Sequence, residues 1–179
     1  MRIGWKAYFM TQAKVAALRS GCNSRPTGCI VVRNKRVLAG GYNGTVSGRA
    51  QCTDRGTEYC YRREVGGPED DKYNVCPSIH AEANAIAQAA LLGISLNGSE
   101  LYCTLQPCFV CLKLLKQVGV VKIYYETPYE SKDRVRDAVW GDFNSVDMIG
   151  ERVVLTDEER NAVMEILGQP TSARRLAVG

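Results

Sequence analysis

The stretch that decides the fold of this 179-residue chain is residues 79–93, which read Ile-His-Ala-Glu-Ala-Asn-Ala-Ile-Ala-Gln-Ala-Ala-Leu-Leu-Gly. Alanine has the highest helix propensity of the amino acids. Pro77 and Ser78 before the stretch and Gly93 at its end are typical of helix boundaries. The pattern predicts a capped helix over 79–92, with His80 and Glu82 in its first turn.

The residues that follow alternate between strand and helix. Residues 101–111 read Leu-Tyr-Cys-Thr-Leu-Gln-Pro-Cys-Phe-Val-Cys, which predicts a strand over 101–104 and a helix over 108–118. A buried strand over 120–125 comes next. Such alternation favours an α/β fold whose sheet has parallel members.

Metal ligands occupy the starts of both helices. His80 is the only histidine of the chain, and Cys108 and Cys111 form a Cys-x-x-Cys that begins 28 positions later. A Cys-x-x-Cys at a helix start favours ionised thiolates. Three protein ligands with one open position are typical of a catalytic zinc, whereas structural zinc has four.

Glu82 supplies the group that such a zinc needs for chemistry. Zinc lowers the pKa of its bound water, and a nearby carboxylate can carry the proton to an amidine nitrogen and then to departing ammonia. H-x-E followed by P-C-x-x-C is the signature of zinc nucleobase deaminases. The alternative is a structural zinc knuckle in which Glu82 is only a favourable charge in the first helical turn.

Length and charge limit the remaining possibilities. The chain length predicts one domain over 1–170 with a flexible tail over 171–179. Lys and Arg number 23 against 19 Asp and Glu, a net charge of +4 that is compatible with phosphorylated ligands. The apolar runs are too short to cross a bilayer and no signal-like run follows Met1, so we expect a soluble, cytoplasmic protein without a membrane partner.

The rest of the chain contributes simple elements and one irregular segment. We expect a helix over 5–19, then strands over 28–33 and 36–40 in a hairpin. Residues 44–78 have no period and form an irregular insertion. Later expectations are a helix over 131–139, a strand over 152–155 and a helix over 157–167 capped by Thr156.

Several motifs together resemble the deoxycytidylate (dCMP) deaminase family, within the cytidine and deoxycytidylate deaminase superfamily. The resemblance covers residues 5–129 and rests on residues 19–25, 28–32, 40–44, 52–54, 80–86 and 104–111. It implies a three-layer α/β/α, cytidine deaminase-like fold around a five-stranded mixed sheet. It also implies conversion of dCMP to dUMP and ammonia, as a supply for thymidylate synthesis, by a homohexamer.

The same resemblance assigns roles at the reacting end of the site. His80, Cys108 and Cys111 hold zinc, and Glu82 shuttles protons. The backbone N–H of Ala81 faces the pyrimidine carbonyl. The carbonyl of Thr104 accepts a hydrogen bond from the leaving amino group.

Three further residues are candidates for binding the rest of the nucleotide. Asn43 is expected to bind the sugar hydroxyl, or else only to tolerate a turn. Arg25 is expected to bind the phosphate, since guanidinium pairs with phosphate through two donors, or else to be a solvated surface residue. Tyr124 or Tyr125 lines the pocket or belongs to the core.

The resemblance also implies control by nucleotides. Many family members are activated by dCTP and inhibited by dTTP at a second site. The candidate residues here are Gly41, Tyr42, Asn43 and Gly44, whose glycines allow backbone N–H groups to approach phosphate. A nucleoside triphosphate at this site would bring Mg²⁺ with it.

The remaining cysteines are read as metal ligands or as buried apolar groups. Eight cysteines in a long chain without an export signal do not indicate a disulfide scaffold. Four of them flank or lie within the insertion and predict a second, structural zinc, the alternative being unpaired thiols: Cys22, Cys52, Cys60 and Cys76. Cys29 and Cys103 lie in predicted strands and read as small hydrophobes.

Other functions stay open at this point. The substrate could instead be dCTP, a modified dCMP or free (deoxy)cytidine, because pocket shape decides among these. A non-enzymatic zinc-binding module is a further alternative, although an intact Glu82 argues against it. No dense basic run with interleaved aromatic residues is present, so we expect no nucleic-acid partner.

Overall fold

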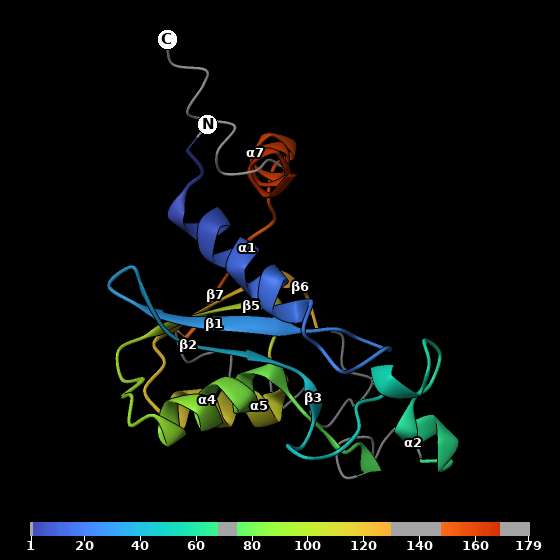
Figure 1. Ribbon diagram of the computed structural model, residues 1–179. Helices are drawn as coiled ribbons and strands as arrows, with labels where there is room; N and C mark the ends of the chain where they lie inside the picture. Colours follow the sequence, from blue (N-terminus) through green and yellow to red (C-terminus); the bar gives the residue numbers. More distant parts are fainter. Residues whose placement is uncertain (1, 68–74, 130–147, 169–179) are drawn as a thin grey trace.

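The computed structural model describes residues 2–67, 75–129 and 148–168, and its centre is a five-stranded mixed sheet (Figure 1). The spatial order of the strands is β2-β1-β5-β6-β7, with the first three antiparallel and the last three parallel. The strands are β1 (Gly28–Arg33), β2 (Arg36–Tyr42), β5 (Glu100–Leu105), β6 (Lys122–Thr127) and β7 (Ile149–Arg152). The predicted α/β class and five-stranded mixed sheet are confirmed.

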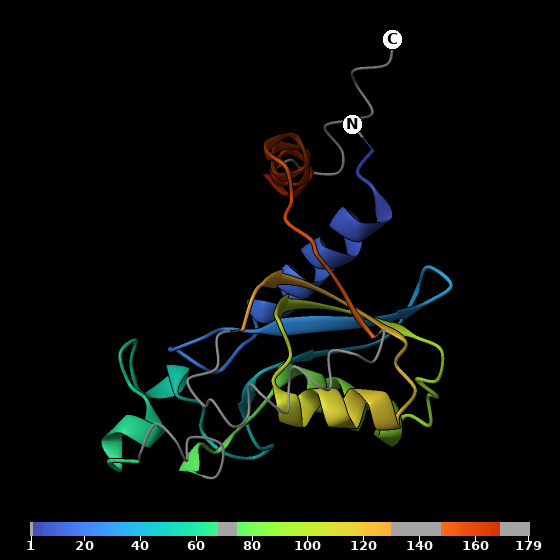
Figure 2. The same ribbon diagram turned by 180° about the vertical axis from the view of Figure 1, so that it is seen from behind.

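Helices cover both faces of this sheet, which gives three layers (Figures 1 and 2). Helix α1 (Trp5–Ala17) packs on one face, and α7 (Asp157–Gly168) lies on the same side. Helices α4 (Ala81–Leu91) and α5 (Phe109–Gln117) pack side by side on the other face. The predicted α/β/α architecture is confirmed.

The strands separate two apolar cores by simple alternation. In β1, Cys29 and Val31 face α4 and α5, whereas Ile30 and Val32 face α1. All four are buried because β1 is an interior strand with helices on both sides. This alternation explains why Cys29 behaves as the small core residue that the sequence predicts.

Local chemistry accounts for the predicted hairpin and the last helix. Asn34 and Lys35, which connect β1 to β2, both have positive φ angles, as a two-residue hairpin turn requires. At the start of α7, the Thr156 hydroxyl accepts from the Glu159 N–H, and the Glu159 carboxylate accepts from the Thr156 N–H. This capping box confirms Thr156 as the cap.

One predicted strand is misplaced. The sequence predicts a strand over 152–155, but β7 ends at Arg152. Val153 and Leu155 are buried and Val154 is exposed, so the alternation is real. β6 runs on to Thr127, and the Val153 N–H donates to the Tyr125 carbonyl at 2.7 Å, so the pairing with β6 ends just beyond Arg152 while the alternation in burial continues to Leu155.

The insertion has little regular structure and is held by polar side chains. Its described part contains β3 (Gly44–Thr45), the short helices η1 (Thr53–Arg55) and α2 (Tyr61–Glu64), and β4 (Ser78–Ile79). The Asn23 amide nitrogen lies within 3.2 Å of the backbone carbonyl oxygens of Cys52, Gly56 and Tyr59. The Gln51 side chain accepts from the Thr45 N–H at 2.8 Å. Side-chain bonds therefore replace a core here.

The small sheet of β3 and β4 was not predicted. Its two strands pair Gly44 with Ile79 and Thr45 with Ser78, and so bring the two ends of the insertion together. The helix predicted over 131–139 and the tail over 171–179 lie outside the described residues. None of the described helices is both long and apolar enough to cross a bilayer.

Candidate zinc site and nucleotide cavity

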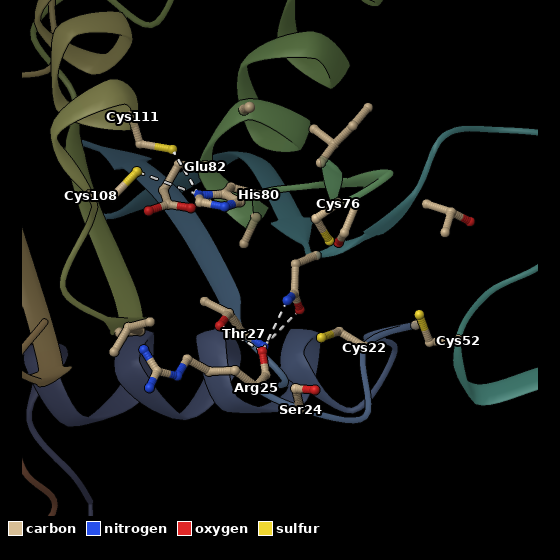
Figure 3. A pocket seen from close by; sticks show the side chains of 18 of the residues that line it. Cys22, Ser24, Arg25, Thr27, Cys52, Cys76, His80, Glu82, Cys108 and Cys111 are labelled. Atoms are coloured by element: carbon tan, nitrogen blue, oxygen red, sulfur yellow. Dashed lines mark hydrogen bonds between the residues drawn. The ribbon is translucent and has the colours of Figure 1, made fainter. Parts of the chain in front are cut away.

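Two helix starts bring the predicted zinc ligands together. His80 precedes α4 and Cys108 precedes α5, and each has the extended backbone of an N-cap residue. Their backbone carbonyls accept the first helical bonds, from Asn84 and Leu112, but their side chains do not cap the helices. Cys111 follows one turn into α5, so all three side chains point to one place (Figure 3).

The distances among these side chains fit zinc. The Nδ1 atom of His80 lies 3.5 Å from the sulfur of Cys108 and 3.5 Å from that of Cys111. Zinc bonds of about 2.3 Å to sulfur and about 2.0 Å to nitrogen, at a tetrahedral angle, place sulfur and nitrogen about 3.5 Å apart. The three ligand atoms lie within 4.8 Å of one another, so zinc can be held without moving the backbone.

The thiols of Cys108 and Cys111 share a hydrogen bond that shifts their pKa values in opposite directions. The Cys111 thiol donates to the Cys108 sulfur, and this bond, with help from His80, lowers the pKa of Cys108 to about 4. The same bond and the burial of the site raise the pKa of Cys111 far above its usual value. The pair thus holds a thiolate at neutral pH and has one further proton to release to a cation.

Glu82 lies beside the ligands and is deeply buried. Its exposed fraction is 4%, and Figure 3 shows its carboxylate next to the His80 ring. Burial is the main reason that the pKa of Glu82 rises to about 7. A carboxyl group with a pKa near neutrality can both accept and return a proton.

These residues line one end of a cavity of about 500 Å³. Arg25 and Arg62 also line it, and Glu82 is the one acidic side chain that the described residues contribute to its wall. Arg62 in addition donates to the Gly67 carbonyl. The cavity therefore combines a metal-ligating end with cationic groups, which suits a phosphorylated ligand.

The structure brings most of the predicted substrate contacts to this cavity. Ala81, Arg25 and Asn43 line its wall. Thr104 lies in β5, and its hydroxyl accepts from the Gly28 N–H at 3.1 Å. Tyr124 packs in the core on the α1 side of the sheet, where its ring stacks on Tyr102 at 4.6 Å, so the structure does not bring Tyr124 together with the cavity residues.

Most of the hydrogen-bonding capacity of the Asn43 side chain is used within the protein. Its side-chain oxygen accepts from the Thr27 N–H at 2.8 Å and from the Ser20 hydroxyl at 2.6 Å. Its amide nitrogen donates to the Arg25 carbonyl at 2.9 Å. Among the contacts of the described residues, one amide hydrogen of Asn43 is left for a ligand.

The two glycines of the turn over 41–44 are closely approached by other residues, Gly41 by backbone and Gly44 by a side chain. A Cβ atom on Gly41 would lie 2.1 Å from the carbonyl oxygen of Ala81, at the start of α4. A Cβ atom on Gly44 would lie 2.7 Å from the Gln51 side chain. Tyr42, between them, is exposed, and its carbonyl accepts from Asn84.

Figure 3 shows Cys22, Cys52 and Cys76 apart from the zinc ligands, and all four cysteines of the insertion region line the same cavity. They are Cys22, Cys52, Cys60 and Cys76. Within the described part of the chain, the group of ligand atoms close enough to share a metal ion is that of His80, Cys108 and Cys111.

Two residues that position α4 were missed at the sequence level. Asn84 donates to the Tyr42 carbonyl at 2.7 Å, and Gln88 accepts from the Gly40 N–H at 2.9 Å. These bonds fix α4, and with it Glu82, against the edge strand β2. The signal was available, because Asn84 and Gln88 are polar residues four positions apart on an otherwise apolar helix face.

Residues 3–127 match the family model of the cytidine and deoxycytidylate deaminase zinc-binding region. The chain belongs to this family. The ComE operon protein 2 of Bacillus subtilis is 38% identical over 134 residues, which are 73% of this chain and 63% of that protein. The deoxycytidylate deaminase of Schizosaccharomyces pombe is 39% identical over 128 residues, which are 72% of this chain and 38% of that enzyme. The chain thus spans less than two thirds of the length of both relatives.

A solved structure matches more of the fold. The dCMP deaminase of the cyanophage S-TIM5, in complex with dCMP and dUMP, has a TM-score of 0.63 and 32% identity. The match covers 84% of this chain and 98% of the cyanophage protein. Membership of this zinc-binding family explains why His80, Cys108 and Cys111 lie at distances that fit zinc.

Proposed function

We propose that the protein hydrolyses dCMP to dUMP and ammonia. The observation that carries this proposal is the buried Glu82 carboxylate beside three ligands at zinc-binding distances, at one end of a cavity that also holds cationic groups. The family membership and the dCMP- and dUMP-bound cyanophage relative support the choice of substrate.

The residues of the chain divide the chemistry between them. Zinc held by His80, Cys108 and Cys111 would supply an activated water for attack on the ring carbon that bears the amino group. Glu82 would carry the two protons of the attacking water, the first to the ring nitrogen and the second to the amino group, which leaves as ammonia. We assign the Ala81 N–H to the pyrimidine carbonyl and the Thr104 carbonyl to the leaving amino group.

The other end of the cavity selects the nucleotide. We assign Arg25 to the 5′-phosphate, because a guanidinium group can pair with phosphate through two hydrogen bonds. Asn43 offers its remaining amide hydrogen to the sugar. Since the described cavity wall carries cationic groups in addition to Glu82, a phosphorylated substrate is favoured over a free nucleoside.

Ammonia release from dCMP, deoxycytidine and dCTP, measured in parallel with zinc-loaded protein, tests this assignment. We expect turnover of dCMP in preference to the other two. Preferential turnover of dCTP or deoxycytidine would assign the enzyme to one of the alternative substrates. If none of the three reacts, even with dCTP added to the dCMP reaction, the proposed substrate is wrong.

We further propose that nucleoside triphosphates control the reaction, with dCTP as activator, dTTP as inhibitor and Mg²⁺ bound to the triphosphate. The candidate site is the turn over 41–44, where the exposed ring of Tyr42 is available to stack on a base. Rates of dCMP turnover that are unchanged by both nucleotides would contradict this. The product dUMP would then feed thymidylate synthesis.

We also propose a second, structural zinc at the four cysteines of the insertion region. Four thiols around one end of the cavity match the ligand number of a closed zinc site. Coordination would require their side chains to draw together from their present positions. Elemental analysis of the purified protein is expected to give two zinc ions per chain.

Assembly and compartment complete the proposal. We infer a homohexamer, supported by exposed apolar side chains such as Leu91 and Leu92 at the end of α4. Light scattering during gel filtration would give the mass of six chains. We place the protein in the cytoplasm because none of the eight cysteines forms a disulfide, as a reducing compartment favours.

A further inference from the structure

Ser78, in β4, carries a hydroxyl group that lacks a hydrogen-bond partner among the described residues. Its Oγ atom is buried, and it is the one buried side-chain oxygen or nitrogen of the described residues without a hydrogen-bond partner. Buried polar groups are nearly always paired, and an unpaired one lowers stability. The residue also lines the cavity, so the missing partner can come from a bound molecule.

The pairing of β3 with β4 puts Ser78 on the same wall as the zinc site. Thr45 lies opposite Ser78 in this small sheet, and Gly44 lies opposite Ile79. Side chains alternate along an extended segment, so Asn43, Thr45, Ser78 and His80 face one side. All four line the cavity.

Position along this wall indicates which part of a nucleotide meets Ser78. Two residues of extended chain separate Ser78 from His80 by about 6.6 Å. This is more than the width of a pyrimidine ring. A nucleotide whose reacting ring carbon lies at the zinc ligands and whose sugar reaches Asn43 would have that sugar within reach of Ser78 on the same wall.

Hydrogen-bond complementarity points to a hydroxyl group. Asn43 has a donor left, its second amide hydrogen. A sugar hydroxyl that accepts from Asn43 still has its own proton to donate, and the Ser78 oxygen can accept it. Rotation of the Ser78 side chain towards the cavity breaks no bond, because the hydroxyl has no partner among the described residues.

We propose that Ser78 is a specificity-determining residue that binds the 3′-hydroxyl of the deoxyribose. This inference rests on the proposed dCMP deaminase function and adds a residue to its substrate contacts. It predicts that the enzyme prefers dCMP to 2′,3′-dideoxycytidine 5′-monophosphate (ddCMP), which lacks that hydroxyl.

Steady-state kinetics of Ser78→Ala with both nucleotides test the proposal. We expect the KM for dCMP to rise about three- to tenfold, the effect of one neutral hydrogen bond, with kcat nearly unchanged. The KM for ddCMP should be the same in the variant and the parent enzyme. Ser78→Thr, which keeps the hydroxyl group, should restore the KM for dCMP.

The stability of the variant separates binding from folding. Ser78→Ala removes an unpaired buried hydroxyl, so its melting temperature should not fall. The matched control is Ser99→Ala, since the buried Ser99 hydroxyl donates to the Leu96 carbonyl at 2.6 Å. That control should lower the melting temperature and leave the KM for dCMP unchanged.

Two results would overturn the proposal: an unchanged KM for dCMP in Ser78→Ala, or an equal rise for dCMP and ddCMP. Calorimetric binding of the two nucleotides to zinc-loaded protein carrying Glu82→Gln, with and without Ser78→Ala, gives the same comparison without turnover. A failure of dCMP turnover in the parent enzyme would therefore count against the proposed reaction, while the binding data still decide the role of Ser78.

Discussion

The two groups of cysteines around the cavity are held in different ways. Cys108 and Cys111 belong to the start of α5, which packs on the sheet beside α4, and their sulfurs lie 3.5 Å from His80 Nδ1. The cysteines of the insertion region lie in or beside a segment held by side chains such as Asn23 and Gln51. The ligand atoms of the first group already lie at distances that fit zinc, whereas the proposed second site would require an ion to draw its sulfurs together.

Removing a ligand of the first group should have the largest effect. Cys108→Ser replaces a thiolate with a weak zinc ligand, so we expect loss of the catalytic zinc and a fall in dCMP turnover of about 10³-fold or more. Zinc content and ammonia release measure the two effects. Cys60→Ser is the matched control and should retain turnover. An equal loss of dCMP turnover in both variants would contradict the assignment of only the first group to catalysis.

The first group should also depend on close backbone packing. In Gly41→Ala the new methyl group would meet the Ala81 carbonyl and displace the start of α4. We expect a loss of about 2–4 kcal/mol in the free energy of unfolding together with weakened turnover. Denaturant unfolding measures the first effect.

The neighbouring glycine provides the control. In Gly40→Ala the nearest atom to the new methyl group is a terminal carbon of Ile30, at 3.1 Å, which can move. This variant should retain most of the stability and activity. If both variants behave alike, the approach of β2 to α4 does not position the site.

A cysteine of the second group should affect zinc content without removing the catalytic ion. We expect Cys52→Ser to reduce zinc from two ions per chain to one, because a closed site needs four ligands. Elemental analysis before and after the substitution checks this. One zinc ion in the unmodified protein would show that the second group holds none.

The smallest expected effect concerns the polar bonds that hold the insertion. Asn23→Ala removes an amide that serves three backbone carbonyls, and we expect a loss of about 1–2 kcal/mol in the free energy of unfolding. Asn161→Ala, at an exposed position in α7, should have no such effect. An equally stable Asn23→Ala protein would mean that other contacts hold the segment.

The difference between the two cysteine groups also explains which parts of the structure the sequence predicts. Helix boundaries around His80 and Cys108 follow from local propensity and spacing, so the zinc ligands were predicted together with the sheet that positions them. Burial follows from alternation, but the point at which strand pairing ends does not, which is why residues 153–155 were assigned to a strand although β7 ends at Arg152. The sheet of β3 and β4 joins two-residue strands more than thirty positions apart, and no local pattern reveals such a pair.

Of the residues predicted to contact the substrate, some line the cavity and Tyr124 does not, because sheet topology decides which way a strand residue faces. Asn43 and Arg25 follow short motifs, and the structure places both at the cavity. Tyr124 alternates with Ile123 in β6, and only the sheet topology decides that Ile123 faces α4 and α5 and Tyr124 faces α1. Ser78 was not predicted as a site residue, because only the folded structure shows that its hydroxyl lacks a hydrogen-bond partner.

The most direct test of the account is the Glu82→Gln variant, assayed for zinc content and for ammonia release from dCMP in the same preparation. The account predicts an unchanged zinc content, because Glu82 is not one of the three ligands, and a fall in turnover of about 10²- to 10⁴-fold, because a glutamine cannot carry the proton. The matched control Glu126→Gln changes a carboxylate that pairs with Lys14 and should leave both quantities unchanged. Turnover of dCMP at the parent rate by the zinc-loaded Glu82→Gln protein would contradict the account.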